Sequence, residues 1–124
     1  MGEIKKKTIL GVDDMPEMLT NINAILKKDY DVRTAIDVQS ALKILETTKI
    51  DLLLLDVEMP TLSGFDFFEK LQKDEALKDI PVVFITANAD DETAQKAIKK
   101  GVQGYLTKPV SPAALLDAVA FFLD

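Results

Sequence analysis

The stretch Leu52-Leu53-Leu54-Leu55-Asp56 is the most apolar in the chain, and it ends on a charged residue. Alternate residues of a strand point to opposite faces of a sheet, so four leucines in a row make both faces apolar. A strand of this kind occurs in the middle of a parallel sheet that helices cover on both sides. The stretch therefore predicts a central parallel strand with Asp56 at its carboxyl end.

Segments of strand and helix character alternate on both sides of this stretch. Short apolar or β-branched runs predict strands at 9–12, 31–35, 52–55, 82–85 and 104–107. Helical spacing of apolar residues and charges typical of helix ends predict helices at 18–26, 38–45, 67–71, 90–100 and 111–122. Five strand–helix repeats with right-handed crossovers predict one α/β doubly wound (βα)5 domain over residues 1–124, with helices on both faces of the sheet.

The composition excludes several classes of site. The chain has no Cys and no His, which rules out disulfides, cysteine nucleophiles, Ser-His-Asp triads and the usual zinc and iron sites. Any chemistry must use carboxylates, hydroxyls, lysines and a hard cation. The net charge of −6 opposes direct binding to nucleic acid. No apolar run reaches the roughly 20 residues that span a bilayer, so we expect a cytoplasmic protein without a membrane contact.

Polar side chains stand at the ends of four of the five predicted strands, as Asp13-Asp14, Asp56, Thr86 and Lys108. Ligand sites of open α/β sheets form at the carboxyl ends of the strands. A flavodoxin-like strand order, 2-1-3-4-5, would make the first and third strands neighbours. That order, which the strand segments alone do not determine, would bring Asp13, Asp14 and Asp56 together.

Such a group of carboxylates favours a magnesium ion and phosphoryl chemistry. Three carboxylates in close contact need a cation to stay ionised, and Mg²⁺ binds oxygen ligands. Asp56 would then attack phosphorus as the nucleophile and form an aspartyl phosphate. Lys108 would neutralise one phosphoryl oxygen, and the Thr86 hydroxyl would donate a hydrogen bond to another.

Each of these residues also has a structural interpretation. Asp14 with Glu17 resembles a helix capping box, and Asp56 is a residue type that starts turns. Thr86 suits the end of a strand, and Lys108 suits an exposed surface. A shared site is favoured because four separate strand ends carry polar residues that fit one chemistry.

The same residues resemble the receiver domains of bacterial two-component response regulators. The matching segments are Val12-Asp13-Asp14, Leu54-Leu55-Asp56-Val57-Glu58-Met59-Pro60, Gly64, Ile85-Thr86-Ala87 and Gly104-Tyr105-Leu106-Thr107-Lys108-Pro109. Each segment alone is a weak signal, but all of them in this order and spacing are specific and extend over nearly the whole chain.

The resemblance implies a phosphorylation site and its metal ligands. Asp56 would be the residue that is phosphorylated and would also bind the metal. Asp14 would bind Mg²⁺ directly, Asp13 largely through water, and the backbone carbonyl of Glu58 would be a further ligand.

The resemblance also implies how the site changes on activation. Thr86 and Lys108 would contact the phosphoryl group, and Tyr105 would be the aromatic residue that changes rotamer. The peptide bond between Lys108 and Pro109 is expected to be cis, although only about 5–6% of X-Pro bonds are cis in folded proteins.

A receiver of this kind would take its phosphoryl group from a histidine kinase or a phosphotransfer protein. It would assist its own phosphorylation and dephosphorylation without being a turnover enzyme, and it would regulate a partner or an output domain. An output domain or a second copy is expected to dock on the surface of the fourth helix, fifth strand and fifth helix. Two questions stay open: whether the receiver stands alone or belongs to a longer regulator or hybrid kinase, and whether it is a pseudo-receiver that binds partners without phosphorylation.

Two other families share parts of this pattern. Phosphatases of the haloacid dehalogenase type also use an aspartate and Mg²⁺, but they need a second Asp where this chain has Glu58. Flavodoxin relatives need a phosphate-binding loop after the first strand, where the acidic Asp13 and Asp14 would repel a flavin phosphate. The sequence therefore favours the receiver.

Overall fold

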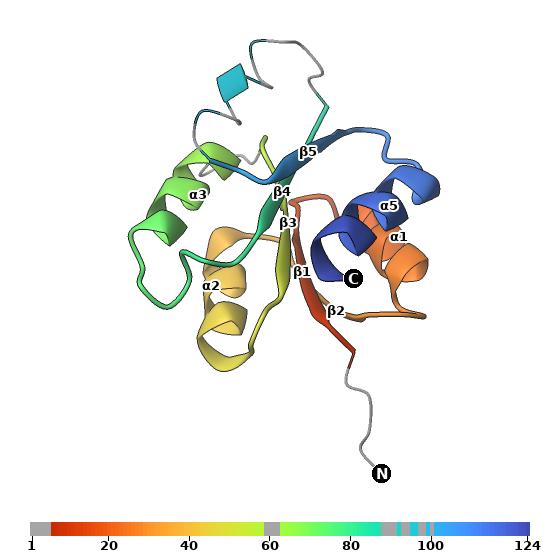
Figure 1. The fold of residues 1–124 in the computed structure, drawn as a ribbon, viewed down its shortest axis with the longest axis horizontal. Helices are drawn as coiled ribbons and strands as arrows, with labels where there is room; N and C mark the ends of the chain where they lie inside the picture. The colour runs from red at the N-terminus through yellow and green to blue at the C-terminus, as the bar shows by residue number, and fades with distance from the viewer. Residues whose placement is uncertain (1–5, 59–62, 88–91, 93–94, 97–98, 100) are drawn as a thin grey trace.

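A five-stranded parallel sheet lies between two layers of helices (Figure 1). The computed structural model describes residues 6–58, 63–87, 92, 95–96, 99 and 101–124. The strands are β1 (Thr8–Val12), β2 (Asp31–Ala35), β3 (Leu52–Asp56), β4 (Val82–Thr86) and β5 (Gly104–Thr107). The helices bounded within these residues are α1 (Pro16–Leu26), α2 (Val38–Thr47), α3 (Gly64–Gln72) and α5 (Pro112–Leu123). None of them is long and apolar enough to cross a membrane.

The strand order is β2-β1-β3-β4-β5, which confirms the flavodoxin-like order. All four strand pairs are parallel, and β3 lies in the middle of the sheet as the leucine stretch predicts. Leu55 pairs with Val12 on one side and with Phe84 on the other. This register places the carboxyl ends of β1, β3 and β4 next to one another.

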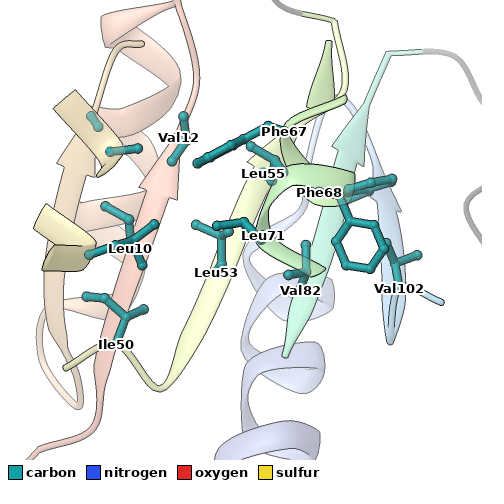
Figure 2. Close-up of a cluster of buried hydrophobic side chains, with 14 of the residues drawn as sticks. Leu10, Val12, Ile50, Leu53, Leu55, Phe67, Phe68, Leu71, Val82 and Val102 are labelled. Atoms are coloured by element: carbon teal, nitrogen blue, oxygen red, sulfur yellow. The ribbon is translucent and has the colours of Figure 1, made fainter. Parts of the chain in front are cut away.

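The leucines of β3 alternate between two apolar clusters. Leu53 and Leu55 pack with Phe67, Phe68 and other residues between the sheet and helices α2 and α3 (Figure 2). Leu52 and Leu54 belong to the cluster beneath helices α1 and α5. All four leucine side chains are fully buried, and burying each contributes about 1.5–3 kcal/mol. The apolar stretch thus anchors the strand that carries Asp56.

Three of the helices are capped at their first turn by a side-chain oxygen that accepts a hydrogen bond. Asp37, Ser63 and Ser111 each accept a hydrogen bond from a backbone N–H in the first turn of α2, α3 and α5. Helix α1 differs, because its N-cap is Met15 and no side chain caps it. The interpretation of Asp14 as a helix cap is therefore wrong.

The predicted helix at 90–100 lies mostly outside the described residues. Its described members, Glu92, Gln95, Lys96 and Lys99, are helical. Gly101 follows with a φ of 95°, a conformation that suits the glycine cap expected at the end of this helix. Met59 and Pro60, in the predicted loop after β3, also lie outside the described residues.

Gly64 is required for the close approach of α3 to the end of β3. A Cβ atom at this position would lie 2.5 Å from the carbonyl oxygen of Asp56 and 2.8 Å from Cα of Val57. Because both neighbours are backbone atoms, the main chain would have to shift. We expect Gly64→Ala to lower the free energy of unfolding by about 1–3 kcal/mol, measured by urea denaturation.

Gly11→Ala provides a matched control within β1. A Cβ atom there would meet the Leu19 side chain at 3.6 Å, an ordinary contact. We expect this variant to be at least as stable as the wild type, because alanine restricts the unfolded chain. Equal stability of the two variants would contradict the steric argument.

Candidate site at the carboxyl end of the sheet

The predicted site residues converge at one edge of the sheet. Asp13 follows β1, Asp56 and Thr86 end β3 and β4, and Lys108 follows β5. Asp13, Asp56 and Thr86 are each at most 1% exposed, and they are the buried polar side chains of the described part of the chain. Burial of polar groups at one end of an otherwise apolar sheet indicates a site with a specific role.

Lys108 links the two buried aspartates. Its Nζ lies 3.1 Å from Oδ2 of Asp13 and 3.3 Å from Oδ1 of Asp56. The backbone N–H of Lys108 donates to the carbonyl oxygen of Thr86 at 2.7 Å, which ties the segment after β5 to the end of β4. The bond between Lys108 and Pro109 is cis, as predicted.

The two carboxylate oxygens of Asp56 have different surroundings. Oδ1 faces Lys108 and also accepts a hydrogen bond from the backbone N–H of Glu58 at 3.2 Å. Oδ2 is buried and accepts no hydrogen bond from the described residues. One oxygen is therefore held in place while the lone pairs of the other remain uncommitted.

Asp13, Asp14 and Asp56 form an acidic cluster. Each offers one carboxylate oxygen, and these oxygens all lie within 4.8 Å of one another. Asp13 is oriented by a hydrogen bond from the backbone N–H of Met15 to its Oδ1, at 2.9 Å. Asp14 is exposed, so the cluster is open to solvent on its side. Clustered carboxylate oxygens with access to water suit a hard divalent cation.

The electrostatics of the site follow from burial and from these charges. Burial raises the pKa of Asp56 to about 7, and the nearby charge of Asp13 adds to the shift, while Lys108 and the Glu58 N–H oppose it. Burial alone would lower the pKa of Lys108, but the carboxylates of Asp13 and Asp56 outweigh it and raise that pKa. Lys108 therefore stays protonated beside an aspartate whose negative charge is costly.

The side chain of Glu58 makes a contact that the sequence did not indicate. The Thr86 hydroxyl donates to Oε1 of Glu58 at 2.5 Å, and the backbone N–H of Ala87 donates to Oε2 at 3.4 Å. In the metal site that the resemblance implies, Glu58 takes part through its backbone carbonyl. Strand pairing could have suggested the contact between Glu58 and Thr86. Asp56 pairs with Ile85, so a residue two positions after Asp56 lies near the end of β4.

Tyr105, the predicted switch residue, lies on β5 next to the site. It pairs with Phe84 of β4, and Thr86 pairs with Thr107 two residues further on. Tyr105 is half-buried and packs against the cluster under α2 and α3. It therefore contacts the core and is also partly exposed to solvent.

Residues 9–120 match the family model of the response regulator receiver domain. This chain belongs to that family. Receiver domains are signalling domains of two-component systems, and the match covers the sheet except for Thr8, together with every residue of the site. The resemblance noted in the sequence is thereby confirmed.

Relatives of this receiver occur in proteins of different architecture. It is 36% identical to part of hybrid signal transduction histidine kinase D of Dictyostelium discoideum over 114 residues, which are 92% of this chain and 7% of that protein. It is 34% identical to the phosphate regulon transcriptional regulatory protein PhoB of Pseudomonas aeruginosa, over 89% of this chain and 48% of that protein. The receiver thus spans less than half the length of these two relatives. Chemotaxis protein CheY-3 of Vibrio cholerae is 34% identical, over 91% of this chain and 88% of that protein.

Solved structures have the same fold. A putative response regulator from Chloroflexus aurantiacus superimposes with a TM-score of 0.89 at 28% identity, over 96% of this receiver and 98% of that chain. Chemotaxis response regulator CheY4 of Vibrio cholerae gives a TM-score of 0.88 at 28% identity, over 96% of this receiver and the whole of that chain. The sheet and its helices are thus those of receiver domains.

Replacing Asp56 with Asn should stabilise the receiver when divalent cations are absent. The folded-state pKa of Asp56 is about 7, above the value of about 4 in an unfolded chain, so the folded state binds the proton more tightly. The stability that this proton gives is complete below about pH 4 and is lost as the pH rises to about 7. Asn does not titrate and avoids this loss. In EDTA at about pH 8, each kcal/mol of stability that Asn preserves should raise the Tm of Asp56→Asn above that of the wild type by about 3–6 °C.

The pH dependence provides the control for this prediction. The Tm difference between Asp56→Asn and wild type, followed by circular dichroism, should narrow as the pH falls from about 7 to 4. Asp117→Asn, an exposed substitution on α5, should show no such trend. A difference that is absent or independent of pH would contradict the electrostatic account of the site.

Proposed function

We propose that Asp56 accepts a phosphoryl group from the phosphohistidine of a histidine kinase or phosphotransfer protein, and that the receiver then changes conformation to regulate a partner or an output domain. One observation carries this proposal. Oδ1 of Asp56 is held by Lys108 and by the Glu58 N–H, while Oδ2 accepts no hydrogen bond from the described residues. Oδ2 is therefore the oxygen that we assign as the nucleophile.

The transfer reaction uses groups that are already in place. A lone pair of Asp56 Oδ2 forms the new bond to phosphorus, and the electrons of the phosphorus–nitrogen bond leave with the donor imidazole. Lys108 neutralises negative charge on the transferring group. The Thr86 hydroxyl and the Ala87 N–H are donors at the end of β4 that suit two of its oxygens.

A magnesium ion fits the acidic cluster. The oxygens of Asp13, Asp14 and Asp56 are close enough to share one ion, and the backbone carbonyl of Glu58 is the further ligand that we propose. When bound, the ion would offset the charge of the clustered carboxylates and of the incoming phosphoryl group. Asp13 and Asp56 are held in position for it by Lys108 and by backbone N–H groups.

The proposed role is signalling and not substrate turnover. The transferred group stays on Asp56, so its product is a modified receiver. Lys108 and Pro109 line a groove together with Met15 and with residues of α1 such as Met18 and Ala24, so a donor protein that reaches Asp56 would cover this groove. The relatives include histidine kinases and transcriptional regulators, which supports a kinase as donor and an attached or separate output. We place these events in the cytoplasm.

We propose that Thr86 and Tyr105 convert phosphorylation into a change of surface. Thr86 would bond the phosphoryl group, and Tyr105 would turn toward the space beside it. The surface concerned includes β5 and α5, where Phe121 is 80% exposed and suits an apolar contact with an output domain or a second copy. The helix before β5 is also expected to form this surface, but most of that helix lies outside the described residues. Tyr105 aromatic NMR signals that do not move on phosphorylation would count against this switch.

Incubation with acetyl phosphate tests the proposed acceptor. In the presence of Mg²⁺, intact-mass spectrometry should detect one phosphoryl adduct on the wild type and on the Asp117→Asn control. The adduct should be absent without Mg²⁺ and absent from Asp56→Asn, because that variant lacks the nucleophilic oxygen. No adduct on the wild type under any condition would favour the pseudo-receiver, and an adduct on Asp56→Asn would mean that another residue is the acceptor.

A further inference from the structure

The carboxylate of Glu58 occupies both donors at the end of β4. Its Oε1 accepts from the Thr86 hydroxyl, and its Oε2 accepts from the Ala87 N–H at 3.4 Å. Thr86 is fully buried, whereas Glu58 is exposed. Because Glu58 is exposed, its carboxylate could bond to water instead, yet both of its oxygens face the end of β4.

The backbone holds Glu58 where its side chain reaches this position. The N–H of Glu58 donates to Oδ1 of Asp56, which fixes the turn that leaves β3. Asp56 pairs with Ile85 across the sheet, so a side chain two residues beyond Asp56 can reach the end of the neighbouring strand. The carboxylate of Glu58 thus comes from the same turn as the proposed phosphoacceptor.

A phosphoryl group on Asp56 would require the same donors. This step rests on the proposed function, which assigns the Thr86 hydroxyl and the Ala87 N–H to phosphoryl oxygens. A hydroxyl has a single proton and donates one hydrogen bond at a time. A carboxylate and a phosphoryl group are also both anions and repel each other at close range. Glu58 and the phosphoryl group therefore exclude each other at the end of β4.

We propose that Glu58 is a positioning residue that acts as an internal substitute for the phosphoryl group. Before phosphorylation its carboxylate holds the Thr86 hydroxyl and the Ala87 N–H in the orientation that an anion on Asp56 would use. When the phosphoryl group arrives, the Glu58 side chain turns out into solvent, which is open to it. On phosphorylation the Thr86 hydroxyl therefore changes its acceptor from the Glu58 carboxylate to the phosphoryl group, and Glu58 has to be displaced.

This role predicts that Glu58 weakens the binding of any phosphoryl analogue to the receiver. The probe is beryllofluoride in the presence of Mg²⁺, titrated into the unphosphorylated protein by isothermal calorimetry. Glu58→Ala removes the competing carboxylate. We expect it to bind beryllofluoride about tenfold more tightly, the change expected when a charge-assisted hydrogen bond no longer has to be broken.

A second variant separates contact from charge. Glu58→Asp keeps the negative charge but shortens the side chain by one methylene group, so its carboxylate no longer reaches both donors. It should bind beryllofluoride as tightly as Glu58→Ala. Glu46→Ala, which removes an exposed glutamate from α2, should bind as the wild type does. The Ala87 amide NMR signal of the free protein should shift in both Glu58 variants and stay in place in Glu46→Ala.

Three results would overturn the inference, and they are distinguishable. Wild-type affinity in both Glu58 variants would show that the carboxylate does not compete, while leaving Asp56 as a valid acceptor. Tighter binding by Glu58→Ala but wild-type affinity of Glu58→Asp would assign the effect to charge at a distance. No binding of beryllofluoride by the wild type would overturn the proposed function and, with it, this role for Glu58.

Discussion

The shared ion pair of Lys108 with Asp13 and Asp56 is the interaction on which the site depends. Two aspartates that are almost completely buried would repel each other across the end of the sheet, and one lysine lies within 3.3 Å of an oxygen of each. Removing Lys108 would leave two buried aspartates without a positive charge beside them, which is strongly destabilising. The ion pair requires β1 and β3 to be neighbours, so the strand order and the chemistry of the site are linked.

Burial of the apolar core stabilises the fold and so offsets the cost of this concentration of charge. β3 is covered on both faces, with Leu53 and Leu55 in one cluster and Leu52 and Leu54 in the other. Its last residue, Asp56, is therefore attached to a central strand that is buried along its whole length. Such a strand can present a reactive carboxylate in a fixed position, while neighbouring loops supply groups that move.

The sequence was sufficient to predict the fold class and to select the residues that converge at the candidate site. Strands and helices follow from residue periodicity, because burial on one or both faces dictates which positions are apolar. β2, with Val32 as its one large apolar residue, gives a weaker signal because it lies at the edge of the sheet. The flavodoxin-like strand order itself was an assumption that the structure confirmed, since pairing between distant strands leaves little trace in any one segment.

Two details of the site were beyond the sequence. Asp14 and Glu17 fit a capping box, but the helix begins with Met15 as its cap and Asp14 joins the acidic cluster. The bond between Glu58 and Thr86 joins residues 28 positions apart and depends on side-chain rotamers. Sequence patterns report which face of an element is buried, and they do not report which of several nearby acceptors a hydroxyl selects.

We propose above all that Asp56 is the residue whose carboxylate forms the bond to phosphorus. Sodium borohydride reduces an acyl phosphate to an alcohol, which converts a phosphorylated aspartate into homoserine. Peptide mapping by tandem mass spectrometry after treatment with acetyl phosphate, Mg²⁺ and borohydride tests this claim most directly. We expect homoserine at position 56. Homoserine at position 13 or 14, or a phosphoryl group that resists borohydride, would contradict it.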